Sequence, residues 1–442
     1  MIGRRKQVTA VADAPPAHGR RLLEVEDLAT HFVTPRGLVR AVDGVSFSLE
    51  RGKTLGLVGE SGCGKSVLSR SIMGLLPSNV ERHGSVEFEG QRLDQLGPAE
   101  LRSFWGTQIA MVFQDPMTSL NPVMRIGRQI TEPLRFHFDM DRGQAEKIAL
   151  SLLESVNIPE PARRLRQYPH ELSGGMRQRV VIAIALACGP KLLFADEPTT
   201  ALDVTVQAQI LELLRTQQRE RDMAMVLVTH DLGVVAGHTD EVAVMYAGQI
   251  VEQAPTRTLF SSMRMPYTAA LLQSIPRLTN ASHTRLNVIA GRPPDLLDPP
   301  PGCRFAPRCP YAQDRCREEQ PPLIEADEPG HLYRCWYPVG TDEAREALER
   351  NLAAHVPQAE LAVSGDMTRA AEVEAALEGA GAAAGPAAYE SDGSAADGPD
   401  GTPADQADAS ADESDGSSGD TAGGTEASSG PDGAEVEIGG SD

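Results

Sequence analysis

The chain has 442 residues, enough for two or three domains at about 150 residues each. Its formal net charge is −21, but residues 370–442 contain eighteen acids and no Lys or Arg, which leaves roughly −3 for the rest. The body of the chain is therefore nearly neutral, and the acidity belongs to a tail. The lack of any run of about 18 apolar residues argues against a transmembrane helix.

The first part of the chain predicts a disordered start followed by two strands. Residues 1–20 are polar and rich in Ala and Pro, so we expect disorder there, and no apolar stretch follows their basic beginning as a secretory signal would require. From residue 22 onward, apolar and polar residues alternate over 23–28 and 42–49, which predicts strands with one polar face. We expect a small antiparallel unit, with a long loop over residues 34–40.

A glycine-rich motif lies between a predicted buried strand at residues 54–58 and a predicted helix at 67–73. It fits G-x-x-x-x-G-K-[ST], the phosphate-binding loop, whose glycines let backbone N–H groups surround an anion at a helix start. Lys65 is expected to reach the β- and γ-phosphates of ATP, and the Ser66 hydroxyl to bind Mg²⁺. The alternative is a glycine-rich turn without a ligand. The predicted ATP-binding residues of this loop are Gly59, Glu60, Ser61, Gly62, Cys63, Gly64, Lys65 and Ser66.

Three further apolar strands are predicted over residues 108–113, 191–195 and 224–229. Each ends on polar residues, and parallel strands of an open sheet bring their carboxyl ends to one edge. The residues that follow the three strands are Gln114, then Asp196 with Glu197, then His230. Between the first two strands, residues 117–170 predict a mostly helical subdomain with breaks at Pro133, Pro159 and Pro161.

These strand-end residues suit ATP hydrolysis. Asp196 is placed to bind Mg²⁺ together with Ser66, and Glu197 to act as the general base toward water. Gln114 could ligate Mg²⁺ and the attacking water, and His230 could contact the γ-phosphate. The alternatives are that the two acids merely begin a solvated loop, and that Gln114 and His230 are structural hydrogen-bonding groups.

Residues 172–179 contain Ser173, Gly174, Gly175 and Gln178 at the start of a predicted helix. Such a start offers backbone donors and a hydroxyl to an anion, although the phosphate-binding loop would already fill its own site. The alternative is a helix-capping serine followed by glycines in a turn.

The order of these motifs resembles that of the ATP-binding cassette (ABC) ATPases over roughly residues 22–262. The resemblance implies a head-to-tail pair in which ATP lies between the phosphate-binding loop of one subunit and the 173–178 segment of the other. It also implies that Asp203, in the stretch Ala201–Leu202–Asp203, contacts the partner. Phe32 is the candidate for stacking on adenine. Because Glu197 is present, we expect a hydrolytically competent half-site.

Beyond residue 262 the chain is similar to the C-terminal segment of oligopeptide and dipeptide importer ATPases, on the stretches 265–272, 291–294 and 302–310. Residues 113–122 and 168–173 support the same subfamily. Four cysteines follow a C-x5-C-x6-C-x18-C spacing, which suits a [4Fe–4S] cluster or tetrahedral Zn²⁺, and the resemblance favours the cluster. These residues are Cys303, Cys309, Cys316 and Cys335, whereas Cys63 and Cys188 are expected to be structural.

The sequence therefore predicts an α/β fold with a parallel phosphate-loop core, a small antiparallel β subdomain, a helical subdomain, a cysteine-containing C-terminal domain and a disordered acidic tail. The expected boundaries are 1–20 for the disordered start, 21–278 for the ABC ATPase domain, 279–340 for the cysteine domain, 341–363 for a short helix and linker, and 364–442 for the tail.

The expected function is that of the ATP-hydrolysing subunit of a peptide importer on the cytoplasmic face of the cell membrane. Its expected partners are a second ABC ATPase, identical or different, two transmembrane permease subunits and, indirectly, an extracytoplasmic solute-binding protein. No nucleic-acid partner is expected. The alternatives are an importer ATPase for another solute, such as nickel or a sugar-linked ligand, and a non-transport ABC ATPase of DNA repair or translation.

Overall fold

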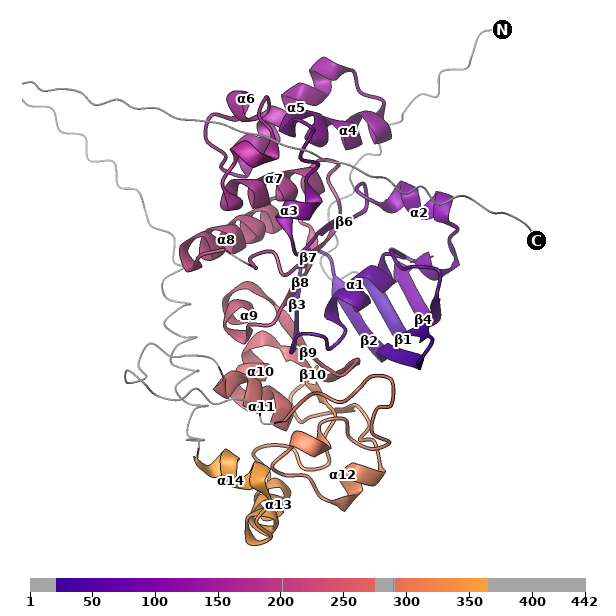
Figure 1. Ribbon diagram of the computed structural model, residues 1–442, viewed down its shortest axis with the longest axis vertical. Helices are drawn as coiled ribbons and strands as arrows, with labels where there is room; N and C mark the ends of the chain where they lie inside the picture. Colours follow the sequence, from indigo (N-terminus) through magenta and orange to yellow (C-terminus); the bar gives the residue numbers. More distant parts are fainter. Residues whose placement is uncertain (1–20, 201, 275–288, 290, 365–442) are drawn as a thin grey trace, which may run out of the picture. The chain divides into compact units, whose positions relative to one another are not determined.

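The computed structural model describes residues 21–200, 202–274, 289 and 291–364, all within one unit of the chain (Figure 1). The disordered start predicted for residues 1–20, Ala201 and the acidic residues from 365 onward lie outside the described residues. The predicted domain boundary after residue 278 also falls in a range that is not described.

Within the described part of the chain, the larger sheet has the strand order β11-β12-β10-β9-β3-β8-β7-β6. Its β3, β8, β7 and β6 strands run parallel, β9 runs parallel to β3, and the remaining strands are antiparallel. The strands are β3 (Thr54–Val58), β6 (Ile109–Val112), β7 (Leu192–Asp196), β8 (Ala224–Thr229), β9 (Glu241–Tyr246), β10 (Gln249–Pro255), β11 (Ile324–Glu325) and β12 (Leu332–Tyr333). The carboxyl ends of β3, β6, β7 and β8 therefore meet at one edge, as the sequence predicts.

The parallel strands are buried on both faces because their apolar side chains alternate between two cores. In β7, Leu193 and Ala195 join the core beneath the helical subdomain, whereas Leu192 and Phe194 join the core against the antiparallel sheet. The helix α1 (Lys65–Ile72) contributes Leu68 and Ile72 to this second core.

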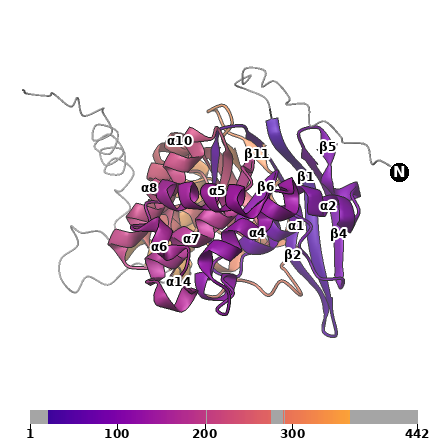
Figure 2. The same ribbon diagram turned by 90° about the horizontal axis from the view of Figure 1, so that it is seen from above.

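A second sheet has the order β2-β1-β4-β5, and α1 lies beside its β1 and β2 strands in Figures 1 and 2. Its strands are β1 (Arg21–Thr34), β2 (Gly37–Glu50), β4 (Val80–Phe88) and β5 (Gln91–Arg92). The expected long loop over residues 34–40 is wrong, since β1 continues to Thr34 and β2 begins at Gly37. The Thr34 hydroxyl donates to the Gly37 carbonyl at 2.7 Å, which closes the hairpin tightly.

The predicted helical subdomain is present between β6 and β7. Pro133 does not break it, because α4 runs from Ile126 to Phe138 with Pro133 inside. A proline removes one backbone hydrogen bond of a helix, and burial of Ile130 and Leu134 in the core holds the helix together. The helices between β6 and β7 are α3 (Pro116–Ser119), α4 (Ile126–Phe138), α5 (Arg142–Ser155), α6 (Pro161–Arg164) and α7 (Gly174–Leu186). The helix α2 (Pro98–Phe104) precedes β6, and α8 (Val204–Glu220) follows β7.

The C-terminal region extends the cassette's own sheet, since β12 pairs with β10 through Tyr333 and Leu332. Cys309 and Ala347 of this region share a core with Val244 and Tyr246 of β9. None of the helices in the described ranges combines the length and apolar character needed to cross a membrane. The helices that follow β8 are α9 (Leu232–His238), α10 (Thr256–Ser262), α11 (Pro266–Gln273), α12 (Asp314–Glu318), α13 (Asp342–Ala353) and α14 (Pro357–Ser364). Short 3-10 turns lie at Leu93–Gln95 and Pro169–Glu171, earlier in the chain, and at Ala306–Arg308.

Candidate nucleotide site

The loop at residues 59–66 leaves β3 and enters α1, as its sequence predicts. Gly62 and Gly64 have φ angles of 79° and 107°, a backbone region that favours glycine. A Cβ atom added to Gly59 would lie 2.1 Å from the Met245 carbonyl oxygen, and one on Gly64 would lie 2.2 Å from the Ala41 carbonyl oxygen. The glycine spacing of the motif is therefore a packing requirement of this fold.

Lys65 is buried, and its ammonium group points back into the loop. Its Nζ atom donates to the carbonyl oxygens of Gly59 at 2.6 Å and Glu60 at 3.0 Å. The neighbouring Cys63 is buried, and burial raises the pKa of its thiol, which suits a structural role rather than a reactive one. The loop thus holds one cation at its centre, where the phosphates of a nucleotide would need it.

Asp196 and Ser66 come together from β7 and α1. The Ser66 hydroxyl donates to Asp196 Oδ1 at 2.9 Å. Asp196 is fully buried, and burial raises the pKa of its carboxyl, while its Oδ2 atom has no hydrogen-bond partner among the described residues. A hydroxyl beside a carboxylate with one free oxygen is a donor set that Mg²⁺ accepts, so these two residues fit the predicted metal site.

The Glu197 carboxylate contacts both Gln114 and His230, the other residues predicted at the strand ends. Its Oε2 atom accepts from Gln114 Nε2 at 2.9 Å, and its Oε1 atom lies 3.4 Å from His230 Nδ1. The sequence reasoning missed Thr200, whose hydroxyl also donates to Oε2 at 2.9 Å. Its position three residues after Glu197, in the turn that leaves β7, is the signal that could have found it.

Glu197 also has an unusual backbone. Its φ angle is 45°, in the left-handed region that non-glycine residues seldom adopt, and its N–H donates to the Val228 carbonyl at 2.9 Å. Left-handed residues outside glycine cluster at functional sites, where the surrounding structure holds them in place.

The 173–178 segment lies at the start of α7. Ser173 is exposed and caps α7 by accepting from the Met176 N–H at 3.4 Å, so the capping interpretation is correct within this chain. Gln178 is 1% exposed and its amide atoms have no partner within the described ranges, which places it behind the surface that Ser173 and Gly174 form.

Asp203 caps α8 by accepting from the Val206 N–H at 2.9 Å. A Cβ atom on Gly175 would lie 2.9 Å from Val206, so the starts of α7 and α8 are in close contact. Phe32 is half-buried in β1, opposite Val39 of β2. Stacking of Phe32 on adenine stays a prediction.

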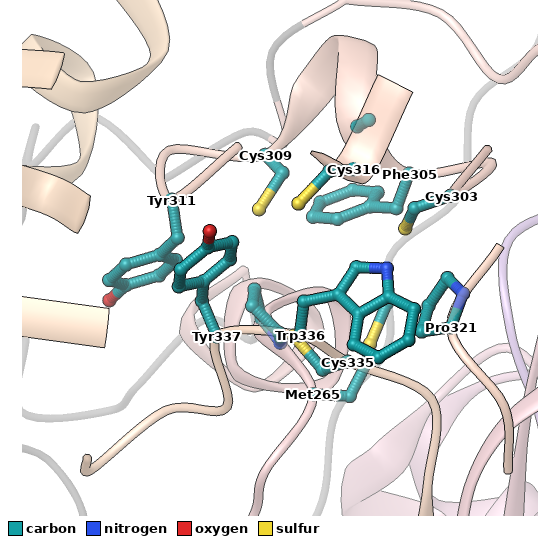
Figure 3. Close-up of a pocket in the computed structure, with 12 residues that line it drawn as sticks. Met265, Cys303, Phe305, Cys309, Tyr311, Cys316, Pro321, Cys335, Trp336 and Tyr337 are labelled. Atoms are coloured by element: carbon teal, nitrogen blue, oxygen red, sulfur yellow. The ribbon is translucent and has the colours of Figure 1, made fainter. Parts of the chain in front are cut away.

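The four C-terminal cysteines line one small cavity of about 10 Å³ together with aromatic residues (Figure 3). Cys303, Cys309 and Cys316 lie on one side of it and Cys335 lies across from them. Burial raises the pKa of all four thiols, that of Cys303 to about 11. As placed, no three His, Cys, Asp or Glu side chains of residues 21–364, outside the undescribed gaps, are close enough to hold a metal ion.

The family described as "ABC transporter" matches residues 42–200, and the family described as "Oligopeptide/dipeptide transporter, C-terminal region" matches residues 251–316. A solved dimeric ATP-binding cassette, in a post-hydrolysis state with ADP and Pi, superposes with a TM-score of 0.49 at 27% identity, covering 53% of this chain and 99% of that chain.

Curated relatives match most of the described chain. The oligopeptide transport ATP-binding protein OppD of Bacillus subtilis is 51% identical over 341 residues, covering 75% of this chain and 95% of the relative. OppD of Salmonella typhimurium is 49% identical over 75% of this chain and 98% of the relative. The dipeptide transport ATP-binding protein DppD of Bacillus subtilis is 51% identical over 72% of this chain and 94% of the relative. The chain belongs to the ABC transporter ATPases, in the branch of these transport ATP-binding proteins.

Proposed function

We propose that the protein is the ATP-hydrolysing subunit of an ABC importer that takes up oligopeptides or dipeptides. The observation that carries this is the 51% identity to an oligopeptide transport ATP-binding protein over 95% of that relative. The match extends past the ATPase core into the C-terminal region at residues 251–316, which supports the peptide branch in particular.

In this proposal, the residues at the sheet edge divide the work of hydrolysis. The N–H groups of the 59–66 loop and the Lys65 ammonium bind the β- and γ-phosphates. Ser66 and Asp196, with Gln114 completing the set, hold Mg²⁺, which neutralises phosphate charge when bound. Glu197 accepts a proton from the attacking water, and His230 contacts the γ-phosphate. The hydrogen bond from Gln114 to Glu197 keeps the base oriented toward the same space.

The second half of each ATP site comes from a partner ATPase in this proposal. Ser173 and Gly174 are exposed at the N-terminus of α7, where they would bind the phosphates held by a partner's phosphate-binding loop. Asp203 at the neighbouring start of α8 is the expected contact beside it. The burial of Gln178 argues for a supporting role behind this surface.

The transport partners are inferred from the relatives' function. Because the relatives are transport ATP-binding proteins, we infer that the energy of hydrolysis passes to other subunits that cross the membrane. We propose two transmembrane permeases, a position at the cytoplasmic face of the membrane and, indirectly, an extracytoplasmic solute-binding protein.

Uptake in the native host tests the function. We expect deletion of the gene to abolish uptake of labelled di- and oligopeptides, and restoration by the wild-type gene but not by Glu197→Gln. Loss of nickel or sugar uptake with intact peptide uptake would select the alternative solute. If no uptake changes, the transporter assignment fails.

We also propose that the four C-terminal cysteines hold a metal centre, with a [4Fe–4S] cluster as the first candidate and Zn²⁺ as the second. Support comes from four thiols that line one cavity, those of Cys309 and Cys316 buried and those of Cys303 and Cys335 partly buried, a soft donor set that suits either centre. The centre would supply a covalent cross-link between distant parts of the C-terminal region.

Anaerobic purification of the full chain tests the metal proposal. We expect a broad visible absorbance and about four iron atoms per chain, and their loss in Cys309→Ser but not in Cys188→Ser, which lies outside the set. A colourless protein with stoichiometric zinc would replace the cluster by Zn²⁺, and a chain without bound metal would refute the site.

A further inference from the structure

Arg308 of the cysteine region reaches across to the phosphate-binding loop. Its Nη1 and Nη2 atoms donate to the two carboxylate oxygens of Glu60 at 2.6 and 2.9 Å, a bidentate ion pair. The Arg308 side chain is only 3% exposed, so the guanidinium is shielded from water at this contact. Bidentate pairs of this kind fix orientation as well as charge.

The surroundings of Arg308 leave it little freedom. The guanidinium also donates to the Tyr246 hydroxyl at 3.3 Å and to the Ile289 carbonyl at 3.1 Å. It lies over the rings of Tyr246 and Phe305, at 5.9 and 6.0 Å from their centroids. Tyr246, Tyr267 and Phe305 contact one another with ring centroids 4.5 to 5.4 Å apart, which makes a rigid aromatic support beneath the loop.

Glu60 is held by its backbone as well. Its N–H donates to the Tyr267 hydroxyl at 2.9 Å, and its carbonyl accepts from the Lys65 ammonium at 3.0 Å. A continuous series of contacts therefore runs from Arg308 through Glu60 to Lys65, the residue that is to bind the phosphates. The carboxylate of Glu60 itself faces Arg308, so its contact with ATP would be made by the backbone.

We propose that Arg308 is a positioning residue for ATP binding, which acts through Glu60 to keep the phosphate-binding loop in its binding conformation. The inference rests on the proposed ATPase function and adds a role for the C-terminal region. Because Arg308 immediately precedes Cys309, the segment that lines the cysteine cavity also fixes the conformation of the phosphate-binding loop. A purely structural Arg308 would instead only fasten the C-terminal region to the sheet.

The test compares full-length variants by affinity for a fluorescent ATP analogue with Mg²⁺. We expect Arg308→Gln and Glu60→Gln each to weaken binding roughly tenfold, which corresponds to about 1.4 kcal/mol. Arg308→Lys should recover part of the affinity, because lysine keeps the charge but loses the bidentate geometry. The double variant should bind no more weakly than either single one, since both remove the same ion pair.

Arg317→Gln is the matched control, because Arg317 is an exposed arginine of the same region that pairs with Asp314. It should bind the nucleotide as the wild type does. In the assembled transporter, Arg308→Gln should raise KM roughly tenfold while kcat changes about twofold at most, because the catalytic residues are untouched.

Three results would overturn the role of Arg308. These are binding within about twofold of the wild type in both single variants, full additivity in the double variant, or an equal loss in the Arg317 control. If Arg308→Gln lowers the unfolding temperature, Glu60→Gln decides the question, since it removes the pair from the more exposed partner. A wild-type chain that binds no ATP would refute the proposed function, and this inference with it.

Discussion

Replacing Glu197 by Gln tests the catalytic geometry most directly. In the wild type, the carboxylate accepts from Gln114 and Thr200 at Oε2 and lies near His230 at Oε1. A glutamine can keep its amide oxygen toward the first two donors and turn its NH₂ group toward His230. The side chain should therefore keep its position while losing the ability to accept a proton from water.

The expected loss follows from that change. General-base catalysis by a positioned side chain contributes about 10²- to 10⁴-fold, so kcat should fall by this factor, or about 3–5 kcal/mol in activation free energy. ATP affinity should stay within about twofold, because Lys65, Ser66 and the loop N–H groups are unchanged. Bound but unhydrolysed ATP should then hold the ATPase pair together.

Phosphate release, nucleotide affinity and light scattering with Mg²⁺ and ATP measure the three effects in the assembled complex. Glu212→Gln makes the same chemical change at an exposed position of α8 and should hydrolyse ATP as the wild type does. Wild-type turnover by Glu197→Gln would refute the assignment of the base. Loss of ATP binding would show that Glu197 supports the fold of the site rather than the chemistry.

Three further predictions follow from the structure. Burial raises the pKa of Asp196 above 3.8, so the ionised carboxylate destabilises the folded chain at neutral pH. Asp196→Asn should therefore raise the unfolding temperature of the Mg²⁺-free chain near neutral pH, and this gain should vanish as the pH falls to about 4. The same variant should lose ATP hydrolysis. Gly59→Ala places a Cβ against the Met245 carbonyl and should weaken ATP binding more than about tenfold in a titration. Pro133→Ala restores a helical N–H donor toward the Gln129 carbonyl and should raise the unfolding free energy by about 1–3 kcal/mol in denaturant titrations; no gain would refute this account of α4.

Much of the nucleotide site could be predicted because its signals are local. The glycines and Lys65 of the loop are adjacent in sequence, and the parallel arrangement of β6, β7 and β8 brings Gln114, Asp196 and His230 to one edge without any knowledge of side-chain packing. The β8 strand has the predicted bounds, residues 224–229. Helix ends were less accurate: α1 runs from Lys65 to Ile72 rather than over residues 67–73.

The remaining contacts depend on residues far apart in sequence, where single-sequence patterns carry no signal. Glu60 and Arg308 are 248 positions apart, and neither residue type suggests the other. The same holds for the buried pair of Glu252 and His331, whose side chains meet at 2.9 Å and join β10 to the C-terminal region. Pro133 was misjudged because core burial of its neighbours outweighs a local helix-breaking preference.

The places where local rules fail within the site share one cause. Glu197 has a left-handed backbone, and Asp196 buries a carboxylate oxygen that has no partner among the described residues. Both arrangements cost free energy in the nucleotide-free chain. A bound metal ion would give the free Asp196 oxygen a partner. The Glu197 backbone is held by its N–H, which donates to the Val228 carbonyl of the neighbouring β8 strand. We expect part of the stability that the fold gives up at this edge to be recovered when a metal ion and nucleotide bind.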